Sequence, residues 1–196
     1  MELSDYTEKF YEAAKKTIAD QSSNIEELIQ LILECYKRDG KLLIAGNGGF
    51  AALSSHIASE LVGRYNDPER RPLAAISLSA DISILTAIAN DFGYENLFIR
   101  QISAYASHND ILLTLSCSGK SPNLLKLIDH CKKIDIRTVN LTGLVDCSTR
   151  SHLCCNIRGL SHIQVSSSEC SIIQEVALQI LHYVCYRVDV ELGSSH

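Results

Sequence analysis

The amino-acid sequence predicts an α/β fold, a three-layer sandwich in which helices flank a five-stranded parallel sheet. Short apolar runs bounded by glycine or polar residues alternate with longer segments of helical periodicity, and this alternation is typical of parallel sheets covered on both faces. A chain of 196 residues has the length of one domain with a helical extension. We expect residues 39–192 to form that domain, and residues 1–38 to form helices that pack on it or on partner subunits.

The N-terminal extension is expected to contain two helices. Apolar residues recur at helical spacing over residues 3–18 and again over residues 25–36. A polar stretch at residues 20–23 separates the two stripes. Ser23 followed by Glu26 is typical of a capping box, which would begin the second helix.

The rest of the chain alternates between strand and helix patterns. The apolar runs predicted as strands span residues 41–45, 73–78, 111–115, 137–141 and 153–157. Helical patterns are expected at residues 51–61, 80–107, 122–134 and 170–191. The second of these helical stretches is expected to be interrupted at residues 90–93.

Composition and charge exclude two classes of protein. A formal net charge of −5 offers no basic surface to a nucleic acid. No apolar run reaches the roughly 18 residues of a membrane span, and the polar N-terminus does not resemble a signal peptide, so we expect a cytoplasmic protein. The eight cysteines are therefore expected to be reduced thiols, and without a C-x-x-C pair a thiolate zinc site is not expected.

Two turns of unusual composition follow predicted strands and precede predicted helices. The first, Gly46-Asn47-Gly48-Gly49, requires glycine because glycine adopts positive φ angles readily. The second, residues 116–121, reads Ser-Cys-Ser-Gly-Lys-Ser. Hydroxyls and free backbone N–H groups at a helix N-terminus suit a phosphate monoester. The alternative is an ordinary serine-rich turn that caps the following helix.

A second group of polar residues lies on two predicted helices. His56 and Glu60 share one helix face, and Gln174 and His182 share a face of the last helix. Two imidazoles, a carboxylate and an amide oxygen suit zinc, or could divide acid and base roles. Taken singly, each residue is more often an ordinary surface or core residue than a ligand, and the spacing does not join the two helices.

Other polar residues allow two interpretations. Asn90 and Asp91 interrupt a helical pattern, where they could hydrogen-bond a polyol or simply end the helix. Arg64, Arg70 and Arg71 are expected to belong to a solvated loop.

Several short motifs follow one another along the chain. They are Gly46-Asn47-Gly48-Gly49, His56-x3-Glu60-Leu61-x-Gly63-Arg64, Ala89-Asn90-Asp91-Phe92-Gly93, Ser116-x-Ser118-Gly119-x-Ser121, Leu141-Thr142-Gly143 and Ile173-Gln174-Glu175-x6-His182. In the identity and the order of these motifs, the chain resembles the phosphoheptose isomerases, which have the flavodoxin-like SIS (sugar isomerase) fold. The resemblance covers nearly the whole chain.

The resemblance implies an isomerase that converts D-sedoheptulose 7-phosphate, a phosphorylated seven-carbon sugar, to D-glycero-D-manno-heptose 7-phosphate for the heptose of lipopolysaccharide or other surface glycans. It also implies a cytoplasmic homotetramer and a zinc ion held by His56, Glu60, Gln174 and His182. Substrate contacts are implied at Asn47, Gly48, Gly49, Glu60, Asn90, Asp91, Ser116, Cys117, Ser118, Ser121 and Gln174. Because such a reaction passes through an enediol, we assign Glu60 as the base and His182 as the acid.

Three residues depart from the pattern of the family. Phe50 stands where a serine usually contacts substrate, Cys117 replaces a threonine, and Lys120 replaces a small polar residue. We expect the Phe50 ring near the pocket mouth, where it would narrow the pocket or change the substrate. The alternatives are therefore an isomerase of a different sugar phosphate, or a non-catalytic SIS protein that serves as a phosphosugar sensor or an adaptor.

Overall fold

A five-stranded sheet forms the middle layer of the computed structural model, which describes residues 2–144 and 160–193. All four strand pairings are parallel, in the order β2-β1-β3-β4-β5. The strands are β1 (Leu42–Gly46), β2 (Ala75–Ser77), β3 (Ile111–Ser116), β4 (Arg137–Thr142) and β5 (Leu160–Gln164). Because the chain leaves β1 toward one side for β2 and later adds β3 on the other, a switch point lies between β1 and β3.

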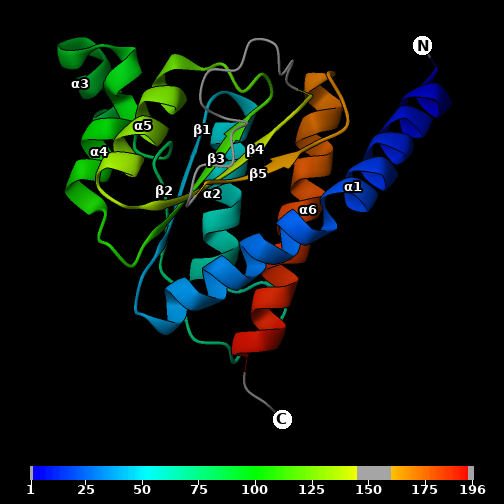
Figure 1. Ribbon diagram of the computed structural model, residues 1–196, viewed down its shortest axis with the longest axis horizontal. Coiled ribbons are helices and arrows are strands. Elements are labelled where there is room, and N and C mark those ends of the chain that lie inside the picture. The colour runs from blue at the N-terminus through cyan, green and yellow to red at the C-terminus, as the bar shows by residue number, and fades with distance from the viewer. Residues whose placement is uncertain (1, 145–159, 194–196) are drawn as a thin grey trace.

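Helices cover both faces of the sheet, as Figure 1 shows. One outer layer holds α1 (Leu3–Lys37), α2 (Gly49–Val62) and α6 (Cys170–Leu192). The other holds α3 (Ile82–Phe92), the short 3₁₀ helix η1 (Tyr94–Asn96), α4 (Leu97–Tyr105) and α5 (Pro122–Lys133). The predicted three-layer α/β architecture is confirmed.

Two hydrophobic cores result, one on each face of the sheet. Along β1 the side chains alternate, so that Leu42 and Ile44 enter the core beneath α1, α2 and α6. Leu43 and Ala45 enter the core beneath α4 and α5. The alternation explains why β1 reads as a continuous apolar run, since both of its faces are buried.

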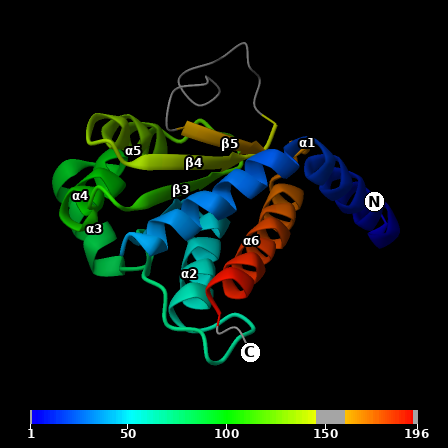
Figure 2. The same ribbon diagram turned by 60° about the horizontal axis from the view of Figure 1, so that its bottom comes forward.

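The N-terminal region differs from the prediction, because residues 3–37 form one helix and not two. The polar residues 20–23 lie within α1 and do not break its hydrogen bonding. Figures 1 and 2 show that α1 crosses α6 and then changes direction, so that its N-terminal part extends past the edge of the sheet. Its second half is buried in the same core as α2 and α6.

Four of the five predicted strands lie where the sequence places them, within two residues at each end. The fifth prediction, residues 153–157, lies outside the described residues. The described fifth strand is β5, which pairs with β4 from Thr138 opposite Leu160 to Thr142 opposite Gln164. Among the described helices, none combines the length and the apolar character needed to cross a membrane.

The expectation that every cysteine is a reduced thiol is wrong for one pair. Cys117, in the turn after β3, forms a disulfide with Cys170, the first residue of α6. Cys35, Cys131 and Cys185 are free and buried. Two elements that are 53 residues apart in sequence are therefore joined covalently at one edge of the sheet.

Candidate active site

The two predicted turns lie side by side at the switch point. Strands β1 and β3 are neighbours, with Gly46 opposite Leu115, so the turns that follow them meet at the same edge of the sheet. Gly48 and Gly119 both have positive φ angles, +58° and +63°, which an L side chain adopts only with strain. Ligands of open parallel sheets bind at such a crevice, outside the carboxyl ends of the strands.

Asn47 is held in this crevice by two partners that the sequence analysis missed. Its side-chain amide and that of Asn123 exchange two hydrogen bonds of 3.0 and 2.9 Å. The Tyr94 hydroxyl donates to Asn47 Oδ1 at 3.0 Å. These three residues come from distant parts of the chain, and no spacing in the sequence indicates that they meet.

The serine turn after β3 is closed by its own hydroxyls. Ser116 Oγ accepts a hydrogen bond from the backbone N–H of Gly119 at 3.0 Å, and Ser118 Oγ accepts from Lys120 at 3.2 Å. Ser121 is the N-cap residue of α5, but its side chain makes no capping hydrogen bond. The turn thus brings two bonded hydroxyls and one further hydroxyl to a helix N-terminus, an arrangement suited to an anion.

A cavity of about 230 Å³ adjoins the glycine turn. Its walls include Asn47, Gly48, Ser79, Ala89 and Tyr94. The next residues along α3, Asn90 and Asp91, are exposed and joined by a 2.7 Å hydrogen bond between their side chains. They lie in the last turn of α3, which continues to Phe92, so the predicted interruption is in fact the end of that helix.

Three of the four predicted metal ligands come together between α2 and α6. His56 Nε2 lies 2.8 Å from His182 Nε2, and His56 Nδ1 lies 3.6 Å from Glu60 Oε1. Burial lowers the pKa of His182, the neighbouring His56 lowers it further, and Glu60 partly opposes both effects. Since two nitrogens at hydrogen-bonding distance share one proton, at least one of the two rings is neutral.

Gln174 does not join this group. It lies two helical turns from His182, about 12 Å along the axis of α6. Its side chain packs so closely on Gly49 that a Cβ added there would be 2.6 Å from Oε1. Its Nε2 lies 3.9 and 3.7 Å from the sulfurs of Cys117 and Cys170.

The donor types in this cluster suit zinc, but the donors do not converge on one point. Imidazole and carboxylate groups are common zinc ligands. In the described part of the chain, however, no group of three or more His, Cys, Asp or Glu residues is placed to hold a metal ion. The reason is that Glu60 faces one nitrogen of the His56 ring and His182 faces the other.

Phe50 does not lie at the pocket mouth, contrary to the prediction. Its side chain is 2% exposed and packs in the core beneath α1, α2 and α6. The sequence does contain a signal for this position, because Phe50 precedes Leu53, Ile57 and Leu61 at the spacing of one buried helix face. The ring therefore does not narrow the crevice. Lys120, another of the three departures, is exposed.

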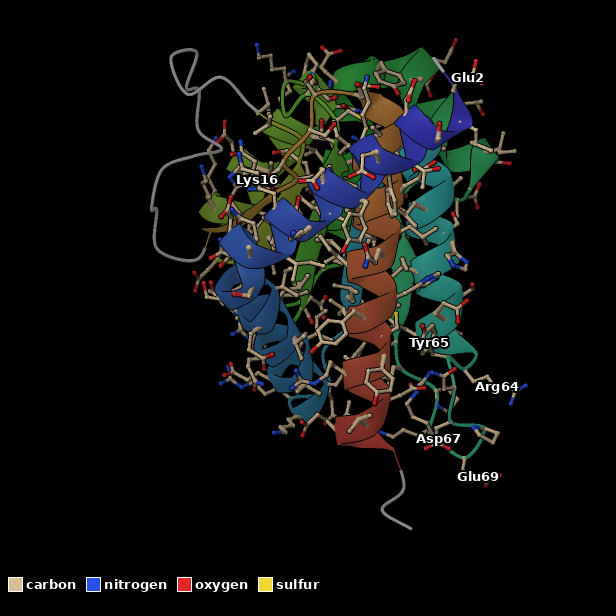
Figure 3. All side chains as sticks on the ribbon, turned by 90° about the vertical axis from the view of Figure 1, so that its right-hand side faces the viewer. Glu2, Lys16, Arg64, Tyr65, Asp67 and Glu69 are labelled. Carbon is tan, nitrogen blue, oxygen red and sulfur yellow. A yellow bond between two sulfur atoms is a disulfide. The ribbon has the colours of Figure 1, made fainter. Side chains whose placement is uncertain are left out.

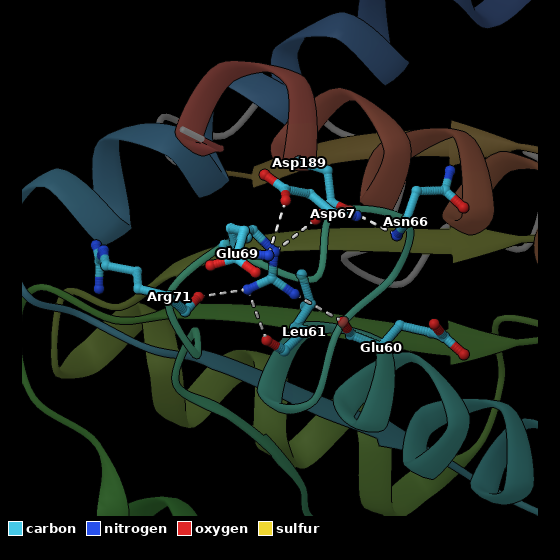
Figure 4. A network of polar contacts seen from close by, with 8 residues as sticks. Glu60, Leu61, Asn66, Asp67, Glu69, Arg71 and Asp189 are labelled. Carbon is cyan, nitrogen blue, oxygen red and sulfur yellow. Dashed lines mark hydrogen bonds and ion pairs between the residues drawn. The ribbon is translucent and has the colours of Figure 1, made fainter. Parts of the chain in front are cut away.

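Arg70 is also placed differently from the prediction, because it is buried. Figure 4 shows the polar network around it, with Glu60, Leu61 and Asp189 labelled. The Arg70 guanidinium pairs with Asp189 of α6 at 2.5 Å and donates to the carbonyl oxygens of Glu60 and Leu61 at 3.0 Å. Asp189 also accepts from the backbone N–H groups of the loop at residues 66 and 67. This network fixes the end of α2 against α6, whereas Arg64 points outward (Figure 3).

Comparison with known proteins gives a consistent result. A family profile described as a SIS domain matches residues 5–143. The chain is 45% identical to phosphoheptose isomerase from Helicobacter pylori over 132 residues, 67% of this chain and 68% of that protein. It is 41% identical to phosphoheptose isomerase from Campylobacter jejuni over 160 residues, 82% of each chain.

Two solved structures are similar to this chain over nearly their whole lengths. The phosphoheptose isomerase from Francisella tularensis matches with a TM-score of 0.86 and 26% identity, covering 96% of both chains. The phosphoheptose isomerase from Neisseria gonorrhoeae matches with a TM-score of 0.83 and 28% identity, covering 95% of this chain and 97% of that one.

Proposed function

The chain belongs to the phosphoheptose isomerase family, whose fold is the SIS domain, and we propose that it converts D-sedoheptulose 7-phosphate to D-glycero-D-manno-heptose 7-phosphate at the crevice between β1 and β3. The observation that carries the assignment of the site is the meeting of the glycine and serine turns at this switch point. The proposed phosphate site is the serine turn, with Ser116, Ser118 and Ser121 as its hydroxyls.

We assign the remaining substrate contacts to the walls of the same crevice. One wall is formed by Asn47, Gly48 and Gly49. The side chains of Asn90 and Asp91 are assigned to hydrogen-bond the hydroxyls of the sugar. Cys117 lies in the serine turn, and Gln174 of α6 lies beside it. Asn123 and Tyr94 support this assignment indirectly, because they hold the Asn47 amide in place.

The proton transfer is assigned to Glu60 and His182. Glu60 takes a proton from C1 of the ketose while His182 donates one to the carbonyl oxygen at C2, which gives the enediol. Return of a proton to C2 and loss of the proton on O1 give the aldose. A lowered pKa keeps His182 largely neutral near pH 7, so it acts as an imidazole N–H donor.

We propose zinc as the cofactor, held by His56, Glu60, Gln174 and His182. The support is the type of the donors and the contact between the two imidazoles. Of these ligands, Gln174 lies two turns away from His182 on α6. When bound, the ion would polarise the substrate carbonyl.

We further propose a cytoplasmic homotetramer that supplies heptose to lipopolysaccharide or another surface glycan. Apolar residues on α1 and α6 support an assembly: Ile18 is 45% exposed, Tyr183 47% and Val190 60%. Figure 3 shows the face on which α1 crosses α6. A cytoplasmic location agrees with the proposed substrate, because a charged sugar phosphate does not cross a membrane unaided.

A coupled turnover assay with sedoheptulose 7-phosphate, on metal-stripped and zinc-reconstituted protein, tests the proposal. We expect zinc-dependent formation of the aldoheptose phosphate. Binding of sugar phosphate without turnover would instead favour a sensor or a different substrate. Absence of both binding and turnover would favour an adaptor.

Substituting Glu60 by Gln tests the assignment of the base. The amide cannot accept the proton from carbon, so we expect kcat to fall by roughly 100-fold or more. The circular dichroism spectrum and the melting temperature should stay close to those of the wild type. Glu69→Gln, in the exposed loop after α2, is the matched control and should retain full turnover. Near-normal activity of Glu60→Gln would remove Glu60 as the base.

A further inference from the structure

We propose that Cys117 and Cys170 form a reversible thiol–disulfide site whose oxidation weakens binding of the substrate phosphate at the serine turn. This inference rests on the proposed function for its biological meaning. Its chemistry rests on the disulfide and on the contacts around it.

The bond lies between two walls of the crevice. Cys117 is the second residue of the serine turn, between Ser116 and Ser118, and Cys170 begins α6. The carbonyl oxygen of Cys117 also accepts a hydrogen bond from the backbone N–H of Gly143 at 3.1 Å. In the oxidised protein the turn is therefore held from two directions, covalently by α6 and through its backbone by the segment after β4.

The disulfide affects phosphate binding because two backbone N–H groups of the turn already have hydrogen-bond partners. The N–H of Gly119 donates to Ser116 Oγ and that of Lys120 donates to Ser118 Oγ. A phosphate that binds these N–H groups must displace both hydroxyls, and in the proposed site the turn rearranges around the phosphate as it does so. The bond to Cys170 resists that movement, and the reduced turn is free of that restraint.

The Gln174 amide adds a second connection between the bond and the crevice. Its Nε2 lies within 4 Å of both sulfurs, and its side chain packs on Gly49. Breaking the bond separates the sulfurs and changes the surface on which this amide rests. A change in the redox state of the pair therefore affects the packing at the glycine turn as well as at the serine turn.

The pair also differs in accessibility from the other described cysteines. Cys170 is exposed and Cys117 is half-buried, whereas Cys35, Cys131 and Cys185 are buried. Burial raises the pKa of Cys35 to about 11 and those of Cys131 and Cys185 to about 12, so these three remain unreactive thiols near pH 7. Within the described part of the chain, oxidants reach Cys117 and Cys170 first.

The reaction balances with a peroxide as oxidant. One cysteine thiolate attacks an oxygen of hydrogen peroxide and the O–O bond breaks, which gives a sulfenic acid and a hydroxide. The hydroxide takes up the proton that the thiol had lost and becomes water. The second thiol then attacks that sulfur, forming the S–S bond and releasing a second water. A dithiol reductant reverses the change by thiol–disulfide exchange. Disulfides of cytosolic proteins are usually of this transient, redox-responsive kind.

The test measures binding of inorganic phosphate by calorimetry to protein that has been reduced with dithiothreitol or oxidised with hydrogen peroxide. Cys147, Cys154 and Cys155, which lie outside the described residues, are replaced by serine in every sample. Peptide mass mapping establishes whether the 117–170 bond is present. We expect oxidation to weaken phosphate binding about tenfold, because the loss of one or two hydrogen bonds to an anion has an effect of this size.

Two variants separate this effect from general oxidative damage. Cys170→Ser should bind phosphate like the reduced protein under both conditions, and Cys131→Ser should keep the full response. Equal phosphate affinity of the oxidised and reduced proteins would overturn the proposal, as would failure of peroxide to form the bond or an undiminished response in Cys170→Ser. Loss of isomerase activity in all samples, with the phosphate response intact, would refute the proposed function and leave the redox site standing.

Discussion

His162 is a residue whose burial should be visible in the pH dependence of stability. It lies on β5, with Nε2 2.8 Å from Thr142 Oγ1, and burial lowers its pKa. In the unfolded chain the imidazole takes up a proton near its ordinary pKa of 6.5, while in the folded protein it stays neutral to lower pH. Its contribution to stability is therefore complete above pH 6.5 and declines as the pH falls below that value.

Urea denaturation at pH 7.5 and pH 5.5 measures this decline in the free energy of unfolding. One such group contributes at most about 1.4 kcal/mol per pH unit. We expect His162→Asn to lose less stability between the two pH values than the wild type. His108→Asn, at an exposed position, should behave like the wild type. Equal pH dependence in all three proteins would contradict the prediction.

Single residues also show where sequence reasoning succeeds. The glycine and serine turns could be predicted because Gly48 and Gly119 occupy conformations that few other residues tolerate. The partners of Asn47 could not be predicted, because Tyr94 and Asn123 reach it only through the fold. For Phe50 the family comparison suggested the pocket, while the helical spacing of its own neighbours indicated the core.

At the scale of elements, the network of Arg70 should be a main stabiliser of the packing of α2 on α6. Removing one partner leaves a buried charge without compensation, which costs about 3–5 kcal/mol. We expect Arg70→Ala and Asp189→Asn each to lower the free energy of unfolding in urea by an amount of this order. Arg187→Ala, which removes ion pairs to Glu26 and Glu191 nearer the surface, should cost about 1 kcal/mol or less.

A double variant distinguishes a coupled pair from two independent losses. If Arg70 and Asp189 act together, the combined substitution should destabilise the protein by less than the sum of the single ones. Strict additivity would mean that the buried ion pair contributes little as a pair.

A helix or strand could be predicted where residues close to it in the sequence determine its ends. The end of α1 and the start of α5 follow from nearby residues, such as Pro122 in the first turn of α5. The continuity of α1 through residues 20–23 does not, because polar residues without glycine or proline are compatible with a loop and with an exposed helix alike. Tertiary packing of α1 on α6 decides between the two.

The whole molecule could be predicted at the level of its three layers, because strand–helix alternation is typical of a parallel sheet covered on both faces. The candidate site could be predicted only in parts. The sequence places His56 and Glu60 on one helix and His182 on another, and only the packing of α2 on α6 brings them together. Gln174 lies two turns from His182 on α6, a separation that the eight-residue spacing between them already implies.

Assembly can be tested on the face formed by α1 and α6. A cavity of about 360 Å³ there is lined by residues that include Ile18, Ile180 and Tyr183. If this face is buried between subunits, Ile18→Glu should lower the mass measured by size exclusion with light scattering. Ile134→Glu is the matched control, since Ile134 is 40% exposed at the end of α5 in the opposite layer. An unchanged mass for Ile18→Glu would place the interface elsewhere.

The bond between Cys117 and Cys170 has a topological consequence in the oxidised molecule. It closes the chain into a covalent ring that contains α5, β4 and β5. A protease that cuts one peptide bond inside the ring opens it without releasing a fragment, because the two pieces remain linked through sulfur. A nicked chain would then migrate at full mass until a reductant separates it into two. Oxidation therefore determines whether a single cleavage between residues 117 and 170 divides the protein.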